Sequence, residues 1–366
     1  MIMTIGEIEK KLHEWVPASW AESYDNVGLL VGKREAAVRG VLVSLDVTQD
    51  IIEEAVEQDC QLIVAHHPPI FKGVKRLTSD HWVERTVIKA IEKGIGILVA
   101  HTNLDNASDG VNARLGQKLG LSDLRILRPF QGRLLKLVTY VPVDHLEKVR
   151  EGLFAAGAGQ VGDRYDECSF LTQGKGSFRP GTKADPFSGS IGVRSVEDEF
   201  RLEVILKDSE QGRVLSALND CHPYEEVAYE LLRIVNADAD RGAGMIGVLE
   251  RPLKPEELFA RIKEALKIPV IRHSQVLGRP IRTVAFCGGS GFFLLEDAVS
   301  AAADVFLTSD IKYHDFFEAD KRILLADIGH YEGEQYSCEL LVEKLRSFAT
   351  FAVRLSEKPT NPISYT

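Results

Sequence analysis

Short hydrophobic runs alternate with amphipathic stretches in the first part of the chain. The runs RGVLVSLDVT, CQLIVAHH and IGILVAH are almost continuously apolar, which is typical of strands buried on both faces of a parallel sheet. Between them, a stretch beginning near Asp50 and the stretch WVERTVIKAIEKG have helical periodicity, and Gly94 is placed to end the second helix. The pattern predicts a parallel α/β sheet covered by helices. Before it, Thr4 and Glu7 fit a capping box that starts a helix.

The last part of the chain repeats this alternation. The runs IRTVAFCGG, ADVFLTSD and KRILLADIGH predict strands, and FFLLEDAVSAAA and HDFFEAD predict helices. When the two parts are laid side by side, AHHPPIF faces TSDIKYHDF and AHTNLD faces ADIGHYEGE, so polar residues follow corresponding strands. We therefore expect one unit built from two similar α/β/α halves, residues 1–130 and 237–366.

A segment of different character, residues 131–236, separates these halves. Its strands alternate apolar and polar positions, and its elements follow the order strand, helix, strand, strand, helix, strand. This order predicts an inserted ferredoxin-like α+β domain, in which QGKGSFRPGTKADPFSGSIG is loop-like and His222 occupies a structural helix-to-strand corner. The alternative is one large sheet without an insert.

Composition narrows the class of protein. A chain of 366 residues favours two or three domains, and a net charge of -10 argues against broad nucleic-acid binding. The five cysteines form no CxxC pair, so neither a disulfide framework nor a thiolate metal site is indicated. The first residues are helical rather than signal-like, and no apolar stretch is long enough to span a bilayer. We expect a cytoplasmic protein without membrane contact.

His66 and His67 end a predicted buried strand, directly before Pro68 and Pro69. Neither proline can donate to a ladder, so the backbone must leave the pleat there, and both imidazoles could then reach one pocket. The alternative is a hydrogen-bonded pair of histidines at a strand end.

His101 and Asp105 follow the next predicted strand, in a loop rich in Asn, Asp, Ser and Gly. Asp105 could bind or bridge a metal ion, and His101 could be a ligand or could orient one. The alternative is that Asp105 caps the helix VNARLGQKLG, although Asp109 is the better candidate for that cap.

His330 and Glu334 follow a strand of the last part with a spacing of i, i+4. If YEGEQYSCELLVEKL is helical from its start, both side chains lie on one face, whereas Glu332 points elsewhere and faces solvent. The alternative is a surface ion pair. Taken together, these imidazoles and carboxylates at matching strand ends predict a site for zinc, manganese or iron.

The motifs HHPPIF, HTNLDNASDGVN, CGGSG, TSDIKYHDF and GHYEGE resemble those of the NIF3 family, also called dinuclear-metal-centre hexameric proteins or GTP cyclohydrolase 1 type 2 homologs. The resemblance covers nearly the whole chain and implies an inserted domain similar to PII and CutA proteins. It also implies two divalent ions per subunit and a toroidal homohexamer, a dimer of trimers. The implied ligands are His66, His67, Asp105, His330 and a bridging Glu334. His101, Asp310 and His314 match motif positions that line the cavity.

The resemblance and the ligand set together favour a metal-dependent hydrolase of a nucleotide-like substrate. The family name implies opening of the purine ring of GTP with release of formate, and phosphoester hydrolysis fits the same ions. In that reading His101 or His314 could shuttle protons. Two alternatives stay open: a carrier or chaperone for iron or another metal, and a regulator whose insert senses a small molecule. CGGSG fits an anion-binding turn and a tight glycine turn equally well, and Cys287 beside it is expected to end a buried strand rather than act as a nucleophile.

Overall fold

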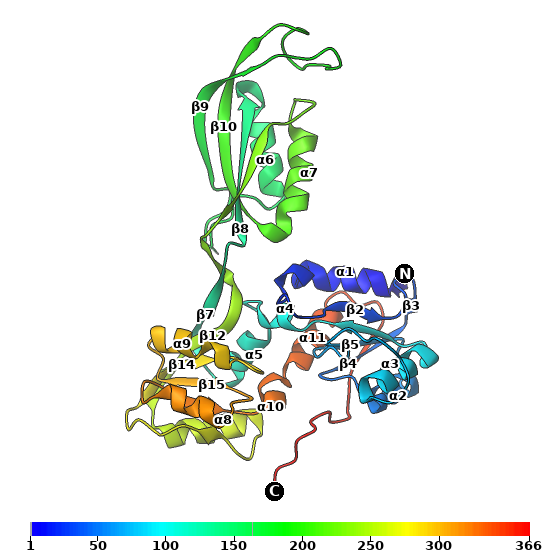
Figure 1. Ribbon diagram of the computed structural model, residues 1–366, viewed down its shortest axis with the longest axis vertical. Coiled ribbons are helices and arrows are strands. Elements are labelled where there is room, and N and C mark those ends of the chain that lie inside the picture. Colours follow the sequence, from blue (N-terminus) through cyan, green and yellow to red (C-terminus); the bar gives the residue numbers. More distant parts are fainter. Residues whose placement is uncertain (1, 163) are drawn as a thin grey trace. The chain divides into compact units, whose positions relative to one another are not determined.

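The computed structural model describes residues 2–162 and 164–366, which fold into two compact units (Figure 1). One unit comprises residues 1–128 and 241–366, and the other comprises residues 129–240. The second unit brackets the predicted insert, residues 131–236. The architecture is mixed α/β, as the hydrophobic pattern predicts. Among the described residues, no helix has the length and apolar character that a bilayer crossing requires.

The first sheet is formed mainly by the N-terminal part of the chain. Its strands lie in the order β17 (Ala352–Leu355), β4 (Gly40–Ser44), β5 (Leu62–Ala65), β6 (Gly96–Val99) and β2 (Gly28–Val31). Strands β17, β4, β5 and β6 are parallel, and β2 is antiparallel to β6. The parallel pairing of β4, β5 and β6 confirms the expectation from their apolar runs. The parallel strands therefore end at one edge of the sheet.

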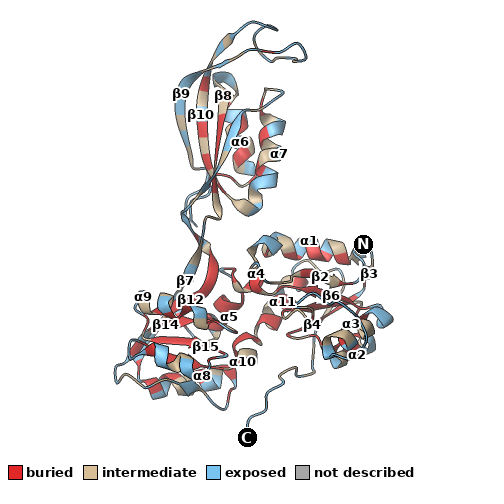
Figure 2. Ribbon diagram, in the orientation of Figure 1, coloured by how far each residue is buried: buried red, intermediate tan, exposed pale blue. Residues whose placement is uncertain are grey.

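Helices bury both faces of this sheet, as Figure 2 shows by the buried strands. Val41 and Val43 of β4 pack with α1 (Ile5–Trp15) and α11 (Ser337–Arg346), whereas Leu42 packs with α2 (Gln49–Glu57) and α3 (Trp82–Lys93). The predicted helix signals are also present. Thr4 and Glu7 form a capping box at α1, and Gly94 ends α3 with a φ of 66°.

The second sheet is formed mainly by the C-terminal part of the chain. Its order is β13 (Arg272–His273), β16 (Leu324–Asp327), β15 (Val305–Thr308), β14 (Ile281–Phe286), β12 (Ala237–Leu253) and β7 (Ser122–Gln131). Strands β14, β15 and β16 are parallel. One apolar cluster joins them to α5 (Val111–Lys118) and α8 (Pro255–Leu266), and another joins them to α9 (Leu295–Ser300). Both faces of this sheet are covered as well.

The two parts of the chain exchange elements, which the hydrophobic pattern does not predict. Strand β17 adds to the first sheet and β7 adds to the second, so residues 1–130 and 237–366 do not fold as separate halves. The cause lies in packing, because α11 and the β17 edge bury apolar residues against the N-terminal sheet. The HDFFEAD stretch is helical as predicted, in the form of the 3-10 helix η5 (His314–Ala319). The chain after Gly329 is also helical from its start, with a break between α10 (His330–Glu334) and α11.

The unit of residues 129–240 contains a four-stranded antiparallel sheet with its own apolar core. Its elements are β8 (Leu134–Pro142), α6 (Leu146–Ala155), β9 (Ser169–Phe178), β10 (Ser195–Lys207), α7 (Gln211–Cys221) and β11 (Tyr229–Ile234), and the strand order is β11-β8-β10-β9. The sequence QGKGSF lies within β9, whereas the rest of this glycine- and proline-rich stretch, residues 179–192, lies between β9 and β10 and has the expected loop character. His222 caps α7 and its ring nitrogens meet Tyr140 O and Tyr224 N, as expected of a structural corner.

Candidate metal centre

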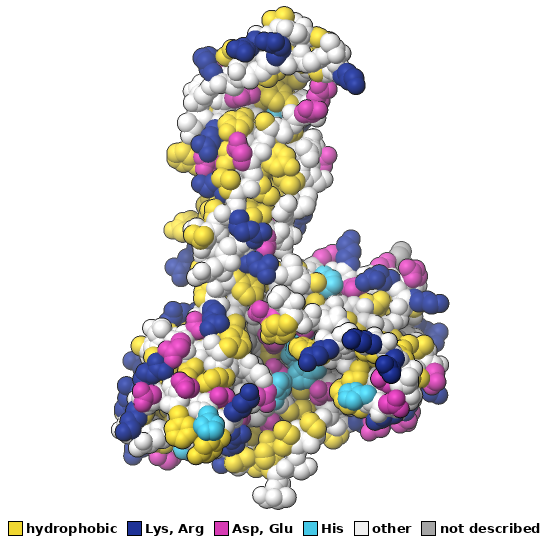
Figure 3. All heavy atoms as spheres, in the orientation of Figure 1, with side chains coloured by type: hydrophobic (Ala, Val, Ile, Leu, Met, Phe, Trp, Pro, Cys, Tyr) yellow, Lys and Arg dark blue, Asp and Glu magenta, His cyan; other side chains and the backbone are white. Residues whose placement is uncertain are grey.

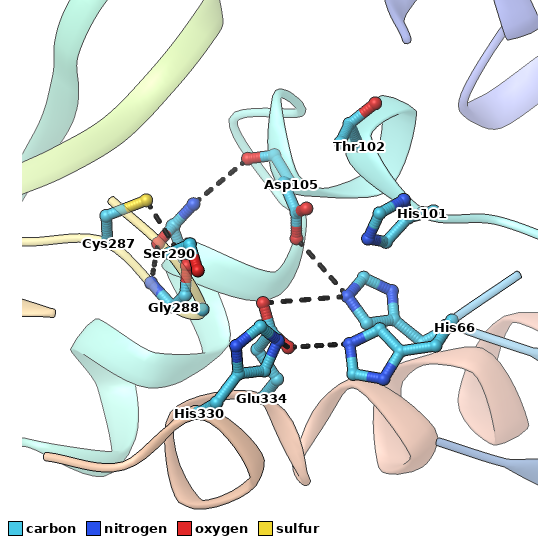
Figure 4. Close-up of polar contacts among 12 residues, drawn as sticks. His66, His101, Thr102, Asp105, Cys287, Gly288, Ser290, His330 and Glu334 are labelled. Atoms are coloured by element: carbon cyan, nitrogen blue, oxygen red, sulfur yellow. Dashed lines mark hydrogen bonds and ion pairs between the residues drawn. The ribbon is translucent and has the colours of Figure 1, made fainter. Parts of the chain in front are cut away.

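Polar side chains that follow three strands, β5, β6 and β16, converge within the unit of residues 1–128 and 241–366. His66 and His67 follow β5, and His101 follows β6 directly before α4 (Thr102–Asp105). His330 and Glu334 lie at the two ends of α10, which follows β16. Figure 4 shows that His66, Asp105 and His330 converge on the Glu334 carboxylate, and Figure 3 shows histidine side chains gathered at the surface of this unit. The structure thus brings together residues more than two hundred positions apart.

The two oxygens of Glu334 face two different groups of side chains. Oε2 lies 2.8 Å from His67 Nε2 and 3.0 Å from His330 Nε2. Oε1 lies on the side of His66, whose Nε2 is 3.9 Å away and is itself 3.5 Å from Asp105 Oδ1. Each group supplies ligand atoms that lie within 4.8 Å of one another, and His101 groups in the same way with His66 and His67. One carboxylate therefore divides a first group, His66 and Asp105, from a second group, His67 and His330.

All four imidazoles are held by an acceptor at Nδ1. His66 Nδ1 lies 2.9 Å from the carbonyl oxygen of Ala100, and the other three each face a carboxylate: Asp46 at 2.7 Å from His67, Asp25 at 2.8 Å from His101, and Asp310 at 2.7 Å from His330. A carbonyl only accepts, so His66 carries its proton on Nδ1 and directs the Nε2 lone pair into the cluster. Such outer acceptors fix the tautomer and ring orientation of metal-binding histidines.

Two buried atoms of the candidate ligands have no hydrogen-bond partner among the described residues. They are His66 Nε2 and Asp105 Oδ1, and both are aimed into the space beside Glu334 Oε1. His66 is fully buried, so an unsatisfied imidazole nitrogen there is costly. Imidazole nitrogen and carboxylate oxygen are the donors that zinc, manganese and iron accept. The residues present therefore fit a divalent ion.

The charges of the cluster depend on burial and on close pairing. Burial opposes the charging of His67 and His330, but hydrogen bonds to Asp46 and Glu334 raise the pKa of His67 to about 9, and hydrogen bonds to Asp310 and Glu334 raise the pKa of His330 to about 11. Burial opposes ionisation of Glu334 as well, yet its histidine partners lower its pKa. Burial, followed by the Glu334 charge, raises the pKa of Asp105. Without ions, the His67 and His330 imidazolium groups offset part of the negative charge of Glu334, Asp46 and Asp310.

A glycine turn closes the site against Glu334. A Cβ at Gly289 would lie 2.2 Å from Glu334 Oε1, and the φ of this residue is 63°, so only glycine fits without strain. Gly288 N donates to Asn112 Oδ1 and Gly291 N donates to Thr308 Oγ1, which satisfies two of the amides that an anion would need. The CGGSG sequence thus forms a tight turn that approaches the cluster. Cys287 is buried, and burial raises the pKa of its thiol.

Several expectations at this site need correction or extension. Glu332 is not solvent-facing: it is buried at 6% exposure and accepts hydrogen bonds from Asn361 and Tyr365. Asp109 does not cap α5, whose N-cap is Gly110, and instead accepts a hydrogen bond from the Trp15 ring nitrogen.

Two carboxylates of the cluster, Asp25 and Asp46, were missed from the sequence. Asp46 follows the buried run VLVSL and so carried the same strand-end signal as the histidines. Asp25 lies before β2, where no such signal exists.

His314 lies outside the cluster. It is exposed at the start of η5, and its ring packs against those of Tyr313 and Phe317. Among the residues that the structure describes, the groups with metal-binding geometry do not include it. A proton-shuttling role for His101 or His314 therefore stays a prediction.

The fold and the cluster define a class: mixed α/β proteins in which buried imidazoles and carboxylates at the sheet edges can hold divalent metal ions. Comparison with known proteins places the chain more closely. It belongs to the Duf34/NIF3 (NGG1p interacting factor 3) family, whose profile matches residues 3–362.

Curated relatives and solved structures agree with this assignment. A Staphylococcus epidermidis protein named GTP cyclohydrolase 1 type 2 homolog is 35% identical over 99% of this chain and 100% of its own, and a Bacillus subtilis protein of the same name is 35% identical over 98% of each chain. The crystal structure of a Bacillus cereus protein related to NIF3 superposes with a TM-score of 0.87 at 32% identity over the whole of both chains. A Staphylococcus aureus structure gives 0.79 at 31% identity, over 100% of this chain and 99% of that one.

Proposed function

We propose that the cluster holds two divalent metal ions and that the protein is a metal-dependent hydrolase of a nucleotide-like substrate. The proposal rests on the position of the Glu334 carboxylate between two groups of ligands. One of its oxygens faces His67 and His330, and the other faces His66 and Asp105. A bridging carboxylate offsets the repulsion between two cations. His66, Asp105 and Glu334 would hold one ion, and His67, His330 and Glu334 the other.

Two such ions supply Lewis acidity and lower the pKa of bound water, which suits hydrolysis of a phosphoester or opening of a purine ring. The other residues around the site would orient the metal ligands. Asp46, Asp25 and Asp310 hold the histidine rings, and the Gly288–Gly291 turn fixes Glu334. A proton-shuttling role for His101 would use Nε2, because Nδ1 is engaged by Asp25. The name carried by the curated relatives supports GTP as the first substrate to test.

The test is metal content per subunit, followed by a substrate screen. Elemental analysis of untagged protein should give close to two equivalents of zinc, iron or manganese, and His67→Ala and Glu334→Gln should lose metal while keeping the fold. The loaded protein would then be assayed against GTP and phosphoesters. Metal-free protein after reconstitution with each ion would refute the metal centre. Two bound ions without turnover would favour a metal carrier instead.

A regulatory role is the second candidate, favoured by a cavity of about 650 Å³ in the unit of residues 129–240. Its strand order and its β8-α6-β9-β10-α7-β11 connectivity support the proposal that this unit is a ferredoxin-like, PII/CutA-like insert. A Cβ at Gly174 of the lining meets nothing within 4 Å, so Gly174→Val would add a side chain to the lining without a clash at Cβ. A regulator should lose its response to a small molecule in this variant with metal content intact. The homohexamer also stays a prediction.

A further inference from the structure

The segment that follows β17, residues 356–365, is anchored to the first sheet. Ser356 N donates to the carbonyl oxygen of Val43 at 2.9 Å. Ser356 Oγ and Glu357 N donate to the two carboxylate oxygens of Glu54 in α2, at 2.5 and 2.8 Å. Glu54 is 3% exposed, and a carboxylate so buried is stable only when it is hydrogen-bonded. The start of the segment is therefore fixed to β4 and α2.

The next part of the segment supports a histidine of the cluster. Thr360 Oγ1 donates to Asp46 Oδ2 at 2.7 Å, and the other oxygen of Asp46 accepts from His67 Nδ1 at 2.7 Å. The far nitrogen of the His67 ring lies 2.8 Å from Glu334 Oε2. A hydroxyl more than two hundred and ninety positions away thus orients the carboxylate that orients the imidazole. Removing it would leave one Asp46 oxygen without this partner.

The following residues hold the short helix that carries the other ligands. Asn361 Nδ2 and Tyr365 OH donate to Glu332 Oε1 at 3.0 and 3.2 Å. Glu332 lies between His330 and Glu334 in α10, which is only five residues long. Its other oxygen, Oε2, is buried without a partner, so the two donors to Oε1 are the main compensation for burying the charge. A helix of this length depends on such tertiary contacts.

We propose that residues 356–365 form a strap that positions His67 and His330, the two ligands that only one of the metal ions would contact. Glu334 is shared by both ions, so the ion held by His66 and Asp105 should be affected much less than the other. The inference rests on the proposed two-ion centre. Thr360 supports the ligand from the first sheet, and Asn361 with Tyr365 supports the ligands from α10. Among the described residues, hydrogen bonds of the strap reach Asp46 and Glu332 but none reaches His66 or Asp105. His66 is oriented by Ala100 O instead, and Asn112 binds the backbone of Asp105.

The test is a two-step Zn²⁺ titration of the full-length protein with a competing chelator, together with Co²⁺ absorption, which reports ligand geometry. Thr360→Val keeps the shape of the side chain and removes the hydroxyl. Loss of an outer partner typically weakens metal binding about 10–100-fold, so one of the two steps should weaken by that factor. Thr360→Ser retains the hydroxyl and should bind both ions like the wild type. Lys358→Ala is the matched control, because Lys358 Nζ donates to the carbonyl oxygen of Asp50 in α2 and makes no hydrogen bond to Asp46 or Glu332 among the described residues.

Asn361→Leu acts on Glu332 rather than Asp46 and should weaken the same step, which keeps the test available if Thr360→Val folds poorly. Equal weakening of both steps, or no change in either, would overturn the strap. A wild type that takes up fewer than two ions would count against the two-ion centre itself and would appear before any variant is made. Absence of hydrolysis, with two ions bound and one step weakened in the variants, would reject the enzymatic proposal and leave the strap standing.

Discussion

At the residue scale, the backbone of Gly289 lies so close to the Glu334 carboxylate that no larger residue fits there. Gly289→Ala would place a methyl group 2.2 Å from Glu334 Oε1, so the carboxylate must be displaced from its position between the two groups of ligands. We expect metal affinity to fall by at least about 10-fold, measured by chelator competition.

Gly94→Ala separates this clash from backbone strain. Gly94 has nearly the same φ, 66° against 63°, but a Cβ there meets nothing within 4 Å. Both variants should lose about 1–2 kcal/mol of stability to the left-handed conformation, and only Gly289→Ala should lose metal. Equal metal content in the two variants would show that Glu334 tolerates the displacement.

Protons and metal ions compete for His67 and His330. Their pKa values in the metal-free protein, about 9 and about 11, keep both rings charged at neutral pH, so binding must release protons. Apparent metal affinity should therefore rise with pH, most steeply below about 9, where both rings must lose a proton. Calorimetry in buffers of different ionisation enthalpy would measure the protons released, and His67→Ala should release fewer. Affinity that is independent of pH between 6 and 9 would contradict these charges.

The same raised pKa values set the stability of the metal-free protein. Because folding raises the pKa of both rings above 6.5, their charges stabilise the fold fully below about pH 6.5, and this contribution is lost as pH rises through 9 to 11. Glu334 has the opposite sign, since its pKa is lowered, and its contribution is lost as pH falls below its unfolded value of 4.5.

The sequence could identify residues of the cluster only where chemistry and strand ends coincide. His66, His67, His101, Asp105, His330 and Glu334 each follow an apolar run, and the structure brings all six together. Asp25 and Thr360 could not be found in this way, because one lies before a short strand and the other in a segment without periodic pattern. Their roles depend on tertiary contacts across 76 and 314 positions.

At the scale of elements, the N-termini of α2 and α5 show how far side-chain caps can be predicted from the local sequence. Thr48 caps α2 by accepting from Ile51 N, whereas Asp109 contacts Trp15 and leaves α5 uncapped by a side chain. Thr48→Ala should cost about 1 kcal/mol, seen as faster hydrogen exchange of the first-turn amides of α2. Asp109→Ala should leave exchange in α5 unchanged. Faster hydrogen exchange in α5 would instead show that Asp109 caps this helix, as the sequence suggested.

The strands that were predicted and those that were missed differ in burial. β4, β5 and β6 are buried at every position, so their apolar runs were sufficient. β17 is mostly exposed at the edge of the sheet, and its sequence, AVRL, carries no comparable signal. Its pairing with β4 depends on α11 packing against the first sheet, which no local pattern encodes. For this reason the sequence pattern could not predict that β17 joins the first sheet and β7 joins the second.

At the scale of the whole molecule, the two compact units have separate cores. The apolar cluster of residues 129–240 contains only residues of that unit, and the clusters around both larger sheets contain none of them. All candidate ligands and their supporting carboxylates lie in the unit of residues 1–128 and 241–366. Stability and metal binding of this unit should therefore not require the other one.

Replacing residues 129–240 by a short Gly-Ser linker tests this independence. The linker would join β7 to β12, which are neighbours in the second sheet, so the ends to be connected are close. We expect the shortened chain to fold and to bind the same number of metal ions as the full chain, measured by circular dichroism and elemental analysis. Hydrolysis, if present, should persist, while any response to a small molecule bound in the cavity of the removed unit should disappear. Loss of metal from a folded shortened chain would show that the removed unit contributes to the metal centre.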